Sequence, residues 1–222
     1  MERDSEAKPP NHDNLEIRII QIKDVDKAVN FLMEYFFPNT PLSVAENKPT
    51  AENALEIRQC IETYGCSIMA LEGDEIVGVC TASPKTRASI EEYFVEADKL
   101  GKTNRYGQIL RLVGEVNRGA AIFDHYGVEN ILCLYQAAVA PSHGGRNIAT
   151  RMTQELMRLA KNWNYQVLSM DCSGHYSARV CERLGMECLN TIAYDTYRND
   201  SGEVIFKPPF PRVAMKTYAK RL

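Results

Sequence analysis

The feature of this sequence that most constrains its fold is a strand–loop–helix unit over residues 131–163. Residues 131–139 (ILCLYQAAV) are largely apolar, which is typical of a central strand covered on both faces. The loop at residues 141–147 (PSHGGRN) contains two adjacent glycines, and the pattern over residues 148–163 predicts a helix. A buried strand that leads into such a loop and helix favours a sheet with helices on both faces.

Strands and helices alternate along the rest of the chain, with one hairpin in the middle. Apolar and alternating runs predict strands over residues 15–22, 66–71, 76–82, 165–171, 187–197 and 212–219. Apolar stripes at helical spacing predict helices over residues 25–37, 50–64 and 173–184. A mostly helical region is expected after Pro84, to about residue 123, with a break near residues 101–106. The expected fold class is therefore α/β, with a central mixed sheet of about seven strands and helices on both faces. We expect a single domain over residues 15–222 after a disordered tail over residues 1–14.

Composition narrows the class of protein. The net charge of −3, with acidic and basic residues interspersed, argues against a nucleic-acid-binding surface. The polar N-terminal sequence lacks the apolar core of a signal peptide, and no apolar run has the length of a membrane span. Seven cysteines without CxxC spacing favour buried reduced thiols, and the four histidines lack metal-ligand spacing. We therefore expect a cytoplasmic protein without a metal and without a nucleic-acid or membrane partner.

The glycine-rich loop is a candidate anion site. Gly144 and Gly145 allow backbone N–H groups to turn inward, and the helix N-terminus adds the positive end of its dipole. Arg146 and Arg151 can add positive charge. A plain tight turn that needs glycine for a positive φ explains the same residues equally well.

Residues 139–149 (VAPSHGGRNIA) resemble the V-x-P-x-x-[QR]-G-x-G-x-[GA] signature of the GNAT superfamily of N-acetyltransferases. Gly144 stands at the Gln/Arg position and Asn147 at the second glycine, and asparagine tolerates left-handed backbone angles better than most residues. The resemblance implies that the loop binds the pyrophosphate of acetyl-CoA, with the pantetheine arm beside the strand and an oxyanion donor near Val139. The residues that it assigns to acetyl-CoA are Ala138, Val139, His143, Gly144, Gly145, Arg146, Asn147, Ile148, Ala149 and Thr150.

A second stretch, residues 171–186 (DCSGHYSARVCERLGM), places Ser173, Ser177 and Cys181 on one helical face. Taken by themselves, these residues favour an ordinary helix with Ser173 as its N-cap. The string C-S-x-H-Y-S-A-R-V-x-E-x-L-G, however, resembles the matching segment of insect arylalkylamine N-acetyltransferases. Further similarity at the motifs Phe36-Phe37, Pro41-Leu42, Gly78 and GEVIFKP (residues 202–208) extends this resemblance over nearly the whole chain.

The resemblance implies roles for several side chains. Ser173 and Ser177 are expected near the sulfur of acetyl-CoA, where they protonate the thiolate or hold a water. The insect enzymes use a glutamate within E-P-L as general base, and the matching residue here is Thr40, which is no base at neutral pH. Glu34, Asp171 or ordered water are the alternatives; Glu34 is also explained as a solvated helix residue, and Asp171 as a helix cap. Where the wider superfamily has a tyrosine acid, this chain has Cys181, which we expect to pack first and to act as an acid second.

The function that follows from the resemblance is acetyl transfer from acetyl-CoA to the primary amine of a small arylalkylamine, of the dopamine, serotonin, tyramine and octopamine class. Direct attack within a ternary complex is expected, in a monomer or weak dimer. Tyr35, Phe36 and Phe37 either wall the amine pocket or belong to the core. The alternatives are polyamines, agmatine, histamine or hydrazine-like amines, and longer acyl-CoA donors. A non-catalytic CoA-binding module is a different class, favoured by Thr40, Gly144 and Asn147.

Overall fold

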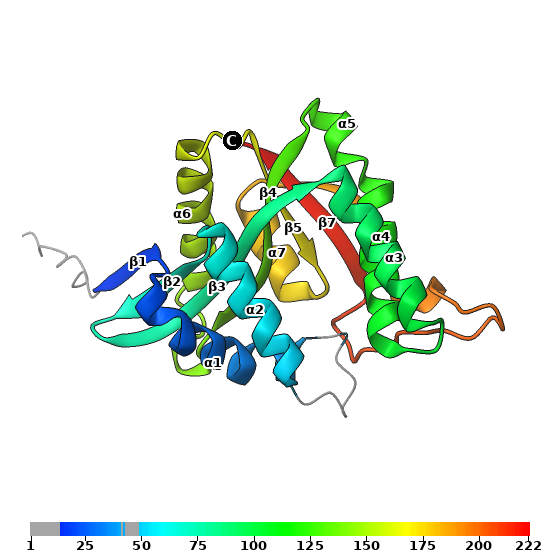
Figure 1. Ribbon diagram of the computed structural model, residues 1–222, viewed down its shortest axis with the longest axis horizontal. Helices are drawn as coiled ribbons and strands as arrows, with labels where there is room; N and C mark the ends of the chain where they lie inside the picture. Colours follow the sequence, from blue (N-terminus) through cyan, green and yellow to red (C-terminus); the bar gives the residue numbers. More distant parts are fainter. Residues whose placement is uncertain (1–13, 41, 43–48) are drawn as a thin grey trace, which may run out of the picture.

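The computed structural model describes residues 14–40, 42 and 49–222 (Figure 1). Residues 1–13 of the predicted tail and Pro41 of the predicted motif lie outside the described residues. Within the described part, a seven-stranded mixed sheet has the order β1-β2-β3-β4-β5-β7-β6. Its strands are β1 (Leu15–Ile19), β2 (Ile68–Glu72), β3 (Glu75–Thr86), β4 (Asn130–Val139), β5 (Val167–Cys172), β6 (Glu187–Ala193) and β7 (Ala214–Arg221).

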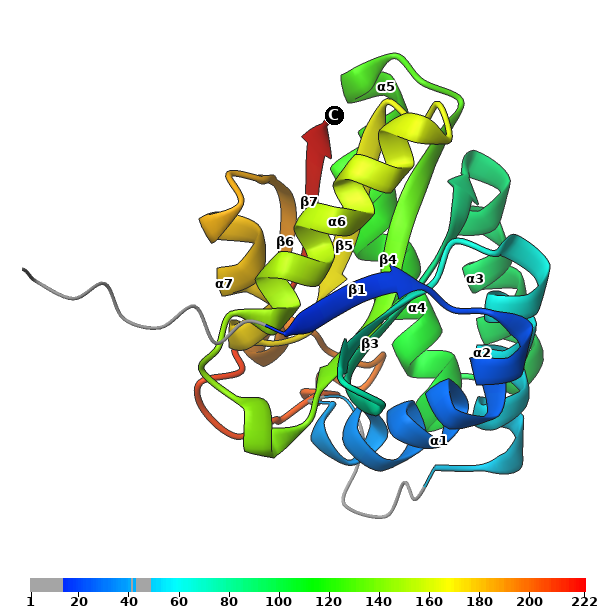
Figure 2. The same ribbon diagram turned by 90° about the vertical axis from the view of Figure 1, so that its left-hand side faces the viewer.

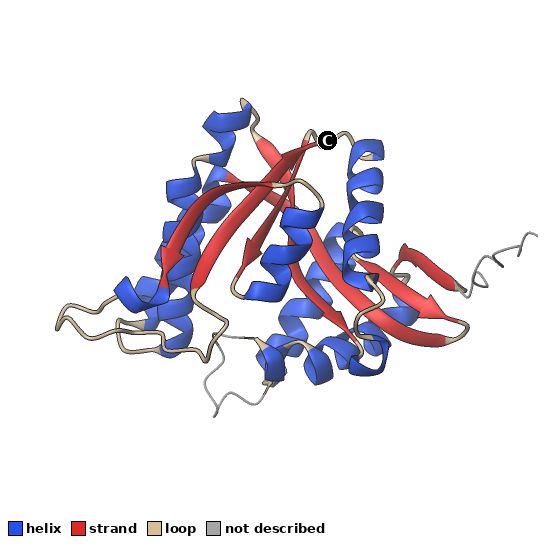
Figure 3. Ribbon diagram, turned by 180° about the vertical axis from the view of Figure 1, so that it is seen from behind, coloured by secondary structure: helices blue, strands red, loops and turns tan. Residues whose placement is uncertain are grey.

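Helices cover both faces of this sheet, as Figures 1 and 3 show from opposite sides. One face carries α1 (Val25–Tyr35), α2 (Ala51–Tyr64), α3 (Arg87–Leu100), α4 (Arg105–Ala120) and α5 (Ile122–Tyr126). The other face carries α6 (Ile148–Asn162) and α7 (His175–Arg183), and Figure 2 shows the sheet between the two layers. The predicted α/β fold with a mixed sheet is therefore confirmed. No helix in the described part combines the length and apolarity needed to cross a membrane.

Strand β4 lies in the middle of the sheet and is covered on both sides, which explains its continuous apolar sequence. Leu132 and Leu134 pack in the cluster that α6 and α7 form on one face. Ile131 packs with the α5 residues on the opposite face, and Ala138 packs with α1 and α2. Alternate side chains of one strand thus enter separate cores.

The predicted strand over residues 76–82 ends too early, because β3 continues through Pro84 to Thr86, and the helical region expected after Pro84 begins at Arg87. The pairing of β3 with β2 ends at Cys80, whereas its pairing with β4 continues to Thr86. Beyond Cys80 one edge of β3 therefore has no strand partner, and a proline without a backbone N–H is tolerated at such an edge.

Other predicted boundaries shift by a few residues. The first strand ends at Ile19 rather than residue 22, and β6 ends at Ala193 rather than residue 197. Helix α7 begins at His175 with Gly174 as its N-cap and no side-chain capping bond, so the interpretation of Ser173 as the N-cap is wrong. The serine thus lies in the turn between β5 and α7, where its side chain is not committed to the helix end.

Strands β4 and β5 are parallel neighbours that separate before either strand ends. They pair at Leu132–Leu168, Cys133–Ser169 and Leu134–Met170, after which β4 continues to Val139. The N–H of Ala140 donates to the carbonyl of Val77 on β3 across 2.9 Å. Because backbone groups alternate in direction along an antiparallel pair, Ala137 and Val139 direct their N–H and C=O groups into the gap beside β5. The gap therefore has an open backbone edge.

A β-bulge in β4 lies beside this gap. Gln136 pairs with Thr81 and Leu134 with Ala82, so Tyr135 is the extra residue of the bulge. Tyr135 and Gln136 both line hollows on the face that carries α2 and α3. A bulge commonly redirects side chains near functional sites.

Candidate active site

A cavity of about 170 Å³ lies where β4 and β5 have separated. Three parts of the chain meet there: the end of α1 and its following turn, β4, and the turn between β5 and α7. The lining residues are Tyr35, Phe36, Asn39, Thr40, Ala137, Ser173, Gly174, Tyr176, Ser177 and Arg212. The structure therefore brings Thr40 together with both predicted serines, and it places Tyr35 and Phe36 as cavity walls. Arg212 was not predicted, because nothing in the Pro-rich segment around it indicates its neighbours.

The two serines are held differently. The hydroxyl of Ser177 donates to the carbonyl of Gly174 across 3.0 Å, so its oxygen keeps free lone pairs that face the cavity. The backbone carbonyl of Ser173 accepts a hydrogen bond of 2.7 Å from the hydroxyl of Tyr194. The turn that carries both serines is thus fixed by internal and tertiary hydrogen bonds.

Of the residues considered as general base, Glu34 lies outside the cavity and is exposed on α1. Its carboxylate hydrogen-bonds the hydroxyl of its neighbour Tyr35 and thereby raises the pKa of Tyr35. Because Tyr35 lines the cavity, Glu34 is connected to the site through this phenol. Sequence reasoning named Glu34 without recognising its connection to Tyr35.

Asp171 is engaged elsewhere. Its Oδ2 accepts from Nζ of the buried Lys85 across 2.7 Å and from Asn117 across 2.9 Å, and its Oδ1 accepts from Thr217 across 2.8 Å. Burial opposes the charge of Lys85, whereas the carboxylate of Asp171 raises the pKa of Lys85 above its usual value. Asp171 therefore caps no helix and holds a buried cation.

Cys181 is fully buried and does not line the cavity. Its sulfur lies 3.5 Å from that of Cys172 and 3.5 Å from that of Met170. These contacts support the prediction that Cys181 packs in the core.

The loop before α6 has the backbone angles that its sequence indicates. Gly145 has φ +77° and Asn147 has φ +59°, both in the left-handed region. A Cβ on Gly145 would meet no atom within 4 Å, so the backbone angle itself is what favours glycine there. Ile148, Ala149 and Thr150 form the first turn of α6, and their amide N–H groups have no acceptor within the helix. These groups form the positive end of a 15-residue helix.

Glu72 at the end of β2 holds two of the predicted phosphate-binding side chains. Arg146 forms an ion pair with both oxygens of Glu72, and Nε2 of His143 lies 3.1 Å from its Oε2. The guanidinium of Arg146 lowers the pKa of Glu72 to about 2. The side chains of Arg146 and His143 are therefore already oriented at the loop, where the carboxylate of Glu72 takes the place that a phosphate group is predicted to occupy.

The residues present fit acetyl-CoA. Ala137 and Val139 offer an open strand edge to an extended amide-containing chain, and the loop with the α6 N-terminus offers N–H groups to a pyrophosphate. Ile148 and Thr150 are buried, so they contribute backbone groups rather than side chains. The prediction that Ala138 binds acetyl-CoA does not fit, because its side chain is buried and its backbone groups face β3, where it pairs with Val79. Among the described residues, no group of histidine, cysteine, aspartate and glutamate side chains could hold a metal ion.

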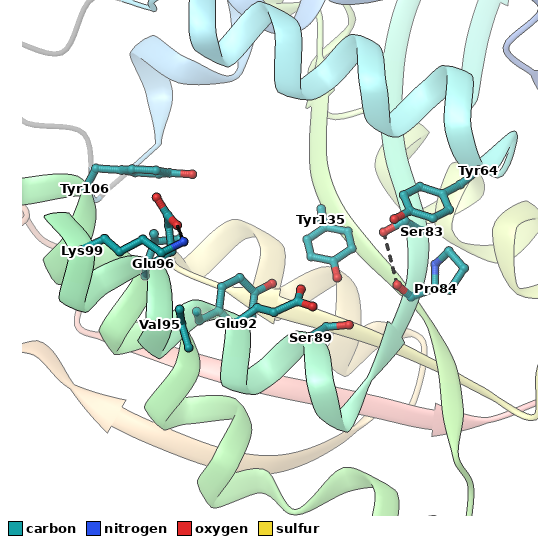
Figure 4. Close-up of a pocket in the computed structure, with 12 residues that line it drawn as sticks. Tyr64, Ser83, Pro84, Ser89, Glu92, Val95, Glu96, Lys99, Tyr106 and Tyr135 are labelled. Carbon is teal, nitrogen blue, oxygen red and sulfur yellow. Dashed lines mark hydrogen bonds and ion pairs between the residues drawn. The ribbon is translucent and has the colours of Figure 1, made fainter.

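Two adjoining hollows of about 500 and 510 Å³ lie between α2 and the α3–α4 pair, and together we call them the acidic groove. Figure 4 shows Tyr135 at its centre, between Tyr64 and Ser83 on one side and Glu92 and Glu96 on the other. Glu56 lines the α2 side, where burial raises its pKa. Sequence reasoning missed this groove, although the spacing of Glu92 and Glu96 places both on one face of a helix.

The family of the chain follows from comparison with known proteins. Residues 26–186 match the family described as "Acetyltransferase (GNAT) family", and the chain therefore belongs to this family. Acetyl-CoA is the acetyl donor of the family, and the prediction of an acetyltransferase is confirmed.

Solved structures of amine N-acetyltransferases share the fold over nearly the whole chain. The polyamine N-acetyltransferase of Drosophila melanogaster, described as catalysing the formation of N-acetylagmatine, has a TM-score of 0.84 and 25% identity over 94% of this chain and 100% of its own. An agmatine N-acetyltransferase, a point mutant in its apo form, reaches a TM-score of 0.86 at 25% identity, over 95% and 100%. A mosquito arylalkylamine N-acetyltransferase like 5b has a TM-score of 0.84 at 25% identity, over 94% and 100%. The resemblance to arylalkylamine N-acetyltransferases is thus confirmed, together with an equal similarity to polyamine and agmatine enzymes.

Proposed function

We propose that this acetyltransferase transfers the acetyl group of acetyl-CoA to the primary amine of a small molecule that carries a second positive charge, such as agmatine or a polyamine. The observation that carries this proposal is the acidic groove, which Glu56, Glu92 and Glu96 line. The single lysine of the groove, Lys99, is ion-paired with Glu96 across 3.1 Å. Tyrosine faces also attract cations.

The groove is suitably placed to hold the far end of such an amine. Gln136 lines the groove, and its neighbour Ala137 lines the cavity beside the serines. The proposal requires an elongated diamine, with one nitrogen near Ser177 and the other near the carboxylates of the groove. Net negative lining also attracts a dication from solution.

An arylalkylamine is the second candidate for the acceptor. Tyr35, Phe36 and Tyr176 line the cavity next to the serines and offer aromatic faces to a catechol or indole ring. The mosquito arylalkylamine N-acetyltransferase has the same fold at 25% identity. These observations support an arylalkylamine as acceptor. Such an amine carries a single positive charge, however, and would leave the carboxylates of the acidic groove without a cation.

The side chains around the cavity support a direct transfer. Acetyl-CoA supplies the acetyl group as an activated thioester. The phenol of Tyr35 accepts the proton of the ammonium while its own proton passes to Glu34, which frees the amine nitrogen to attack. The open N–H groups of Ala137 and Val139 stabilise the negative charge that develops on the acetyl oxygen. Ser177 then turns from the carbonyl of Gly174 and donates its hydroxyl proton to the departing thiolate. The nitrogen of the new amide loses its second proton, which returns to Ser177 through water, and the proton on Glu34 passes to solvent.

The seven cysteines are unpaired in the structure, which supports the proposal of a reducing, cytoplasmic compartment.

The test is thiol release from acetyl-CoA with agmatine, spermidine, histamine, tyramine, dopamine and serotonin as acceptors. The highest kcat/KM is expected for agmatine or spermidine. A preference for tyramine, dopamine or serotonin would instead support the arylalkylamine class. Binding of acetyl-CoA by calorimetry without thiol release from any acceptor would contradict the proposed activity and favour a non-catalytic CoA-binding module.

A further inference from the structure

Lys85 is a lysine in the interior of the protein. It lies on β3, and its side chain is 0% exposed to solvent. Its Nζ donates to Oδ2 of Asp171 across 2.7 Å and to Oδ1 of Asn117 across 3.0 Å. The same ammonium lies 5.2 Å from the ring centroid of Tyr135. A buried charge is costly unless it is paired, so this lysine depends on Asp171.

The ion pair connects strands that are not neighbours. Lys85 belongs to β3 and Asp171 to β5, and β4 lies between them in the sheet. Asp171 follows Met170, the last residue of β5 that pairs with β4. The contact between Lys85 and Asp171 therefore crosses β4 at the point where β4 and β5 begin to separate.

Two further elements converge on the same carboxylate. Asn117 of α4 donates to Oδ2 of Asp171 across 2.9 Å, and Thr217 of β7 donates to Oδ1 across 2.8 Å. Asn117 and Thr217 are both buried. Asp171 is thus fixed by donors from β3, α4 and β7, and Ser173 follows it by two residues in the chain.

We propose that Lys85 and Asp171 are positioning residues that fix the end of β5 relative to β4 and thereby place the Ser173–Ser177 turn at the open edge of β4. Neither residue lines the cavity, so their effect on the reaction passes through the backbone. The ammonium of Lys85 also contacts the ring of Tyr135, the bulge residue of β4. The same charge therefore contacts β4 on one side of the gap and β5, through Asp171, on the other. The proposal rests on the role that the proposed function gives to the two serines.

The experiment compares wild-type protein with the double variant K85M/D171N. Removing both charges together avoids an unpaired buried charge, and an amide at position 171 can still accept from Asn117 and donate to the hydroxyl oxygen of Thr217. We expect a melting temperature within a few degrees of wild type. We expect an unchanged Kd for acetyl-CoA and an unchanged KM for the amine, with kcat reduced at least about tenfold. A folded double variant with a kcat within twofold of wild type would overturn the proposal.

A milder variant keeps the proposal testable if the double variant does not fold. Thr217→Val has nearly the same shape and removes one hydrogen bond from Asp171. It is expected to lower kcat by about threefold to fivefold without changing KM for acetyl-CoA. An unchanged kcat in this variant would also contradict the positioning role.

The matched control is R18M/D24N, which neutralises another close ion pair, of 2.7 Å, in the β1–α1 region. Its kcat is expected to stay within twofold of wild type, and an equal loss of kcat there would show a general effect of charge removal and overturn the proposal. Wild-type protein that releases no thiol with any amine would contradict the proposed function. Wild-type activity with equal activity in K85M/D171N would contradict the positioning role alone.

Discussion

The buried hydroxyl of Tyr194 donates a hydrogen bond to the backbone carbonyl of Ser173 across 2.7 Å. Tyr194 follows β6 at the edge of the sheet, and its ring lies 6.0 Å from that of Phe206. The hydrogen bond connects this edge to the turn that carries the candidate catalytic serines. One phenol thus holds the turn at Ser173, two residues after Asp171.

Replacing Tyr194 with phenylalanine removes this hydrogen bond and keeps the ring. We expect a loss of about 1 kcal/mol in the free energy of unfolding, and a decrease in kcat of about threefold to tenfold because the turn is less well fixed. Tyr218→Phe is the matched control, since it also removes one hydrogen bond of a buried tyrosine, to Glu182 at 2.9 Å. Equal kcat values in the two variants would contradict a role for Tyr194 in the site.

Replacing Ser177 with alanine tests the proton donor. We expect kcat to fall by about 100-fold, with a change in the free energy of unfolding below about 1 kcal/mol. Thr196→Ala is a suitable control, because Thr196 also donates from its hydroxyl to a backbone carbonyl three residues before it, at 3.1 Å. Thiol release by Ser177→Ala at the wild-type rate would remove this serine from the mechanism.

Gly144 and Gly145, in the loop that we propose to bind the pyrophosphate, allow the effect of a strained backbone angle to be compared with the effect of an added methyl group. Gly145→Ala places a Cβ at φ +77°, and we expect a destabilisation of about 1 kcal/mol and a several-fold higher KM for acetyl-CoA. Gly144 has φ −59°, which alanine adopts readily, so Gly144→Ala is expected to have a smaller effect on KM. Steady-state kinetics with varied acetyl-CoA measure both, and the reverse order would be inconsistent with the loop geometry.

Glu72 makes a pH-dependent contribution to stability. Its pKa of about 2 lies below the ordinary value of 4.5, so the stabilisation is present above pH 4.5 and is lost as the pH falls from 4.5 towards 2. We expect Glu72→Gln to melt below wild type at pH 7, and the difference between the two melting temperatures to narrow below pH 4.5. Thermal unfolding followed by circular dichroism from pH 7 to pH 3 measures this; a constant difference would argue against the ion pair with Arg146.

Glu92 tests the acidic groove. Removing its charge by Glu92→Gln is expected to raise KM for agmatine or spermidine by about fivefold, corresponding to about 1 kcal/mol for an accessible charge pair. KM for acetyl-CoA should not change. Glu91→Gln is the control, because Glu91 pairs with Arg118 and does not line the groove. An unchanged KM for both dications would count against the groove as the binding place of the second charge.

The fold was predictable because its central unit is local in the sequence. The apolar run of β4, the glycine-rich loop and the amphipathic pattern of α6 follow each other without interruption, and together they define a covered strand and a helix. The predicted end of the strand at residue 82 was too early, because a proline such as Pro84 normally ends a strand. The unpaired edge of β3, on which its tolerance depends, arises only when the sheet has formed.

The candidate site was predictable only where the chain itself places residues close together. Ser173 and Ser177 are four residues apart, and family resemblance indicated Thr40, at the position of the family's glutamate, which lines the same cavity. The contact between Lys85 and Asp171 spans 86 positions, and a single lysine near the end of a strand carries no signal of burial. Tertiary pairs of this kind follow from the packing of the sheet rather than from a local pattern.

The three residue pairs that join β4 to β5 form a short seam between two blocks of sheet, one containing β1–β4 and the other β5–β7. Few backbone hydrogen bonds cross this seam, so beyond its three pairs the two blocks are joined by side chains, such as those of Lys85 on β3 and Asp171 on β5. An incoming extended molecule can then be accommodated as an additional partial strand without unravelling the protein. The architecture thus keeps one strand-wide opening in an otherwise continuous sheet, with a width that side chains rather than a backbone ladder determine.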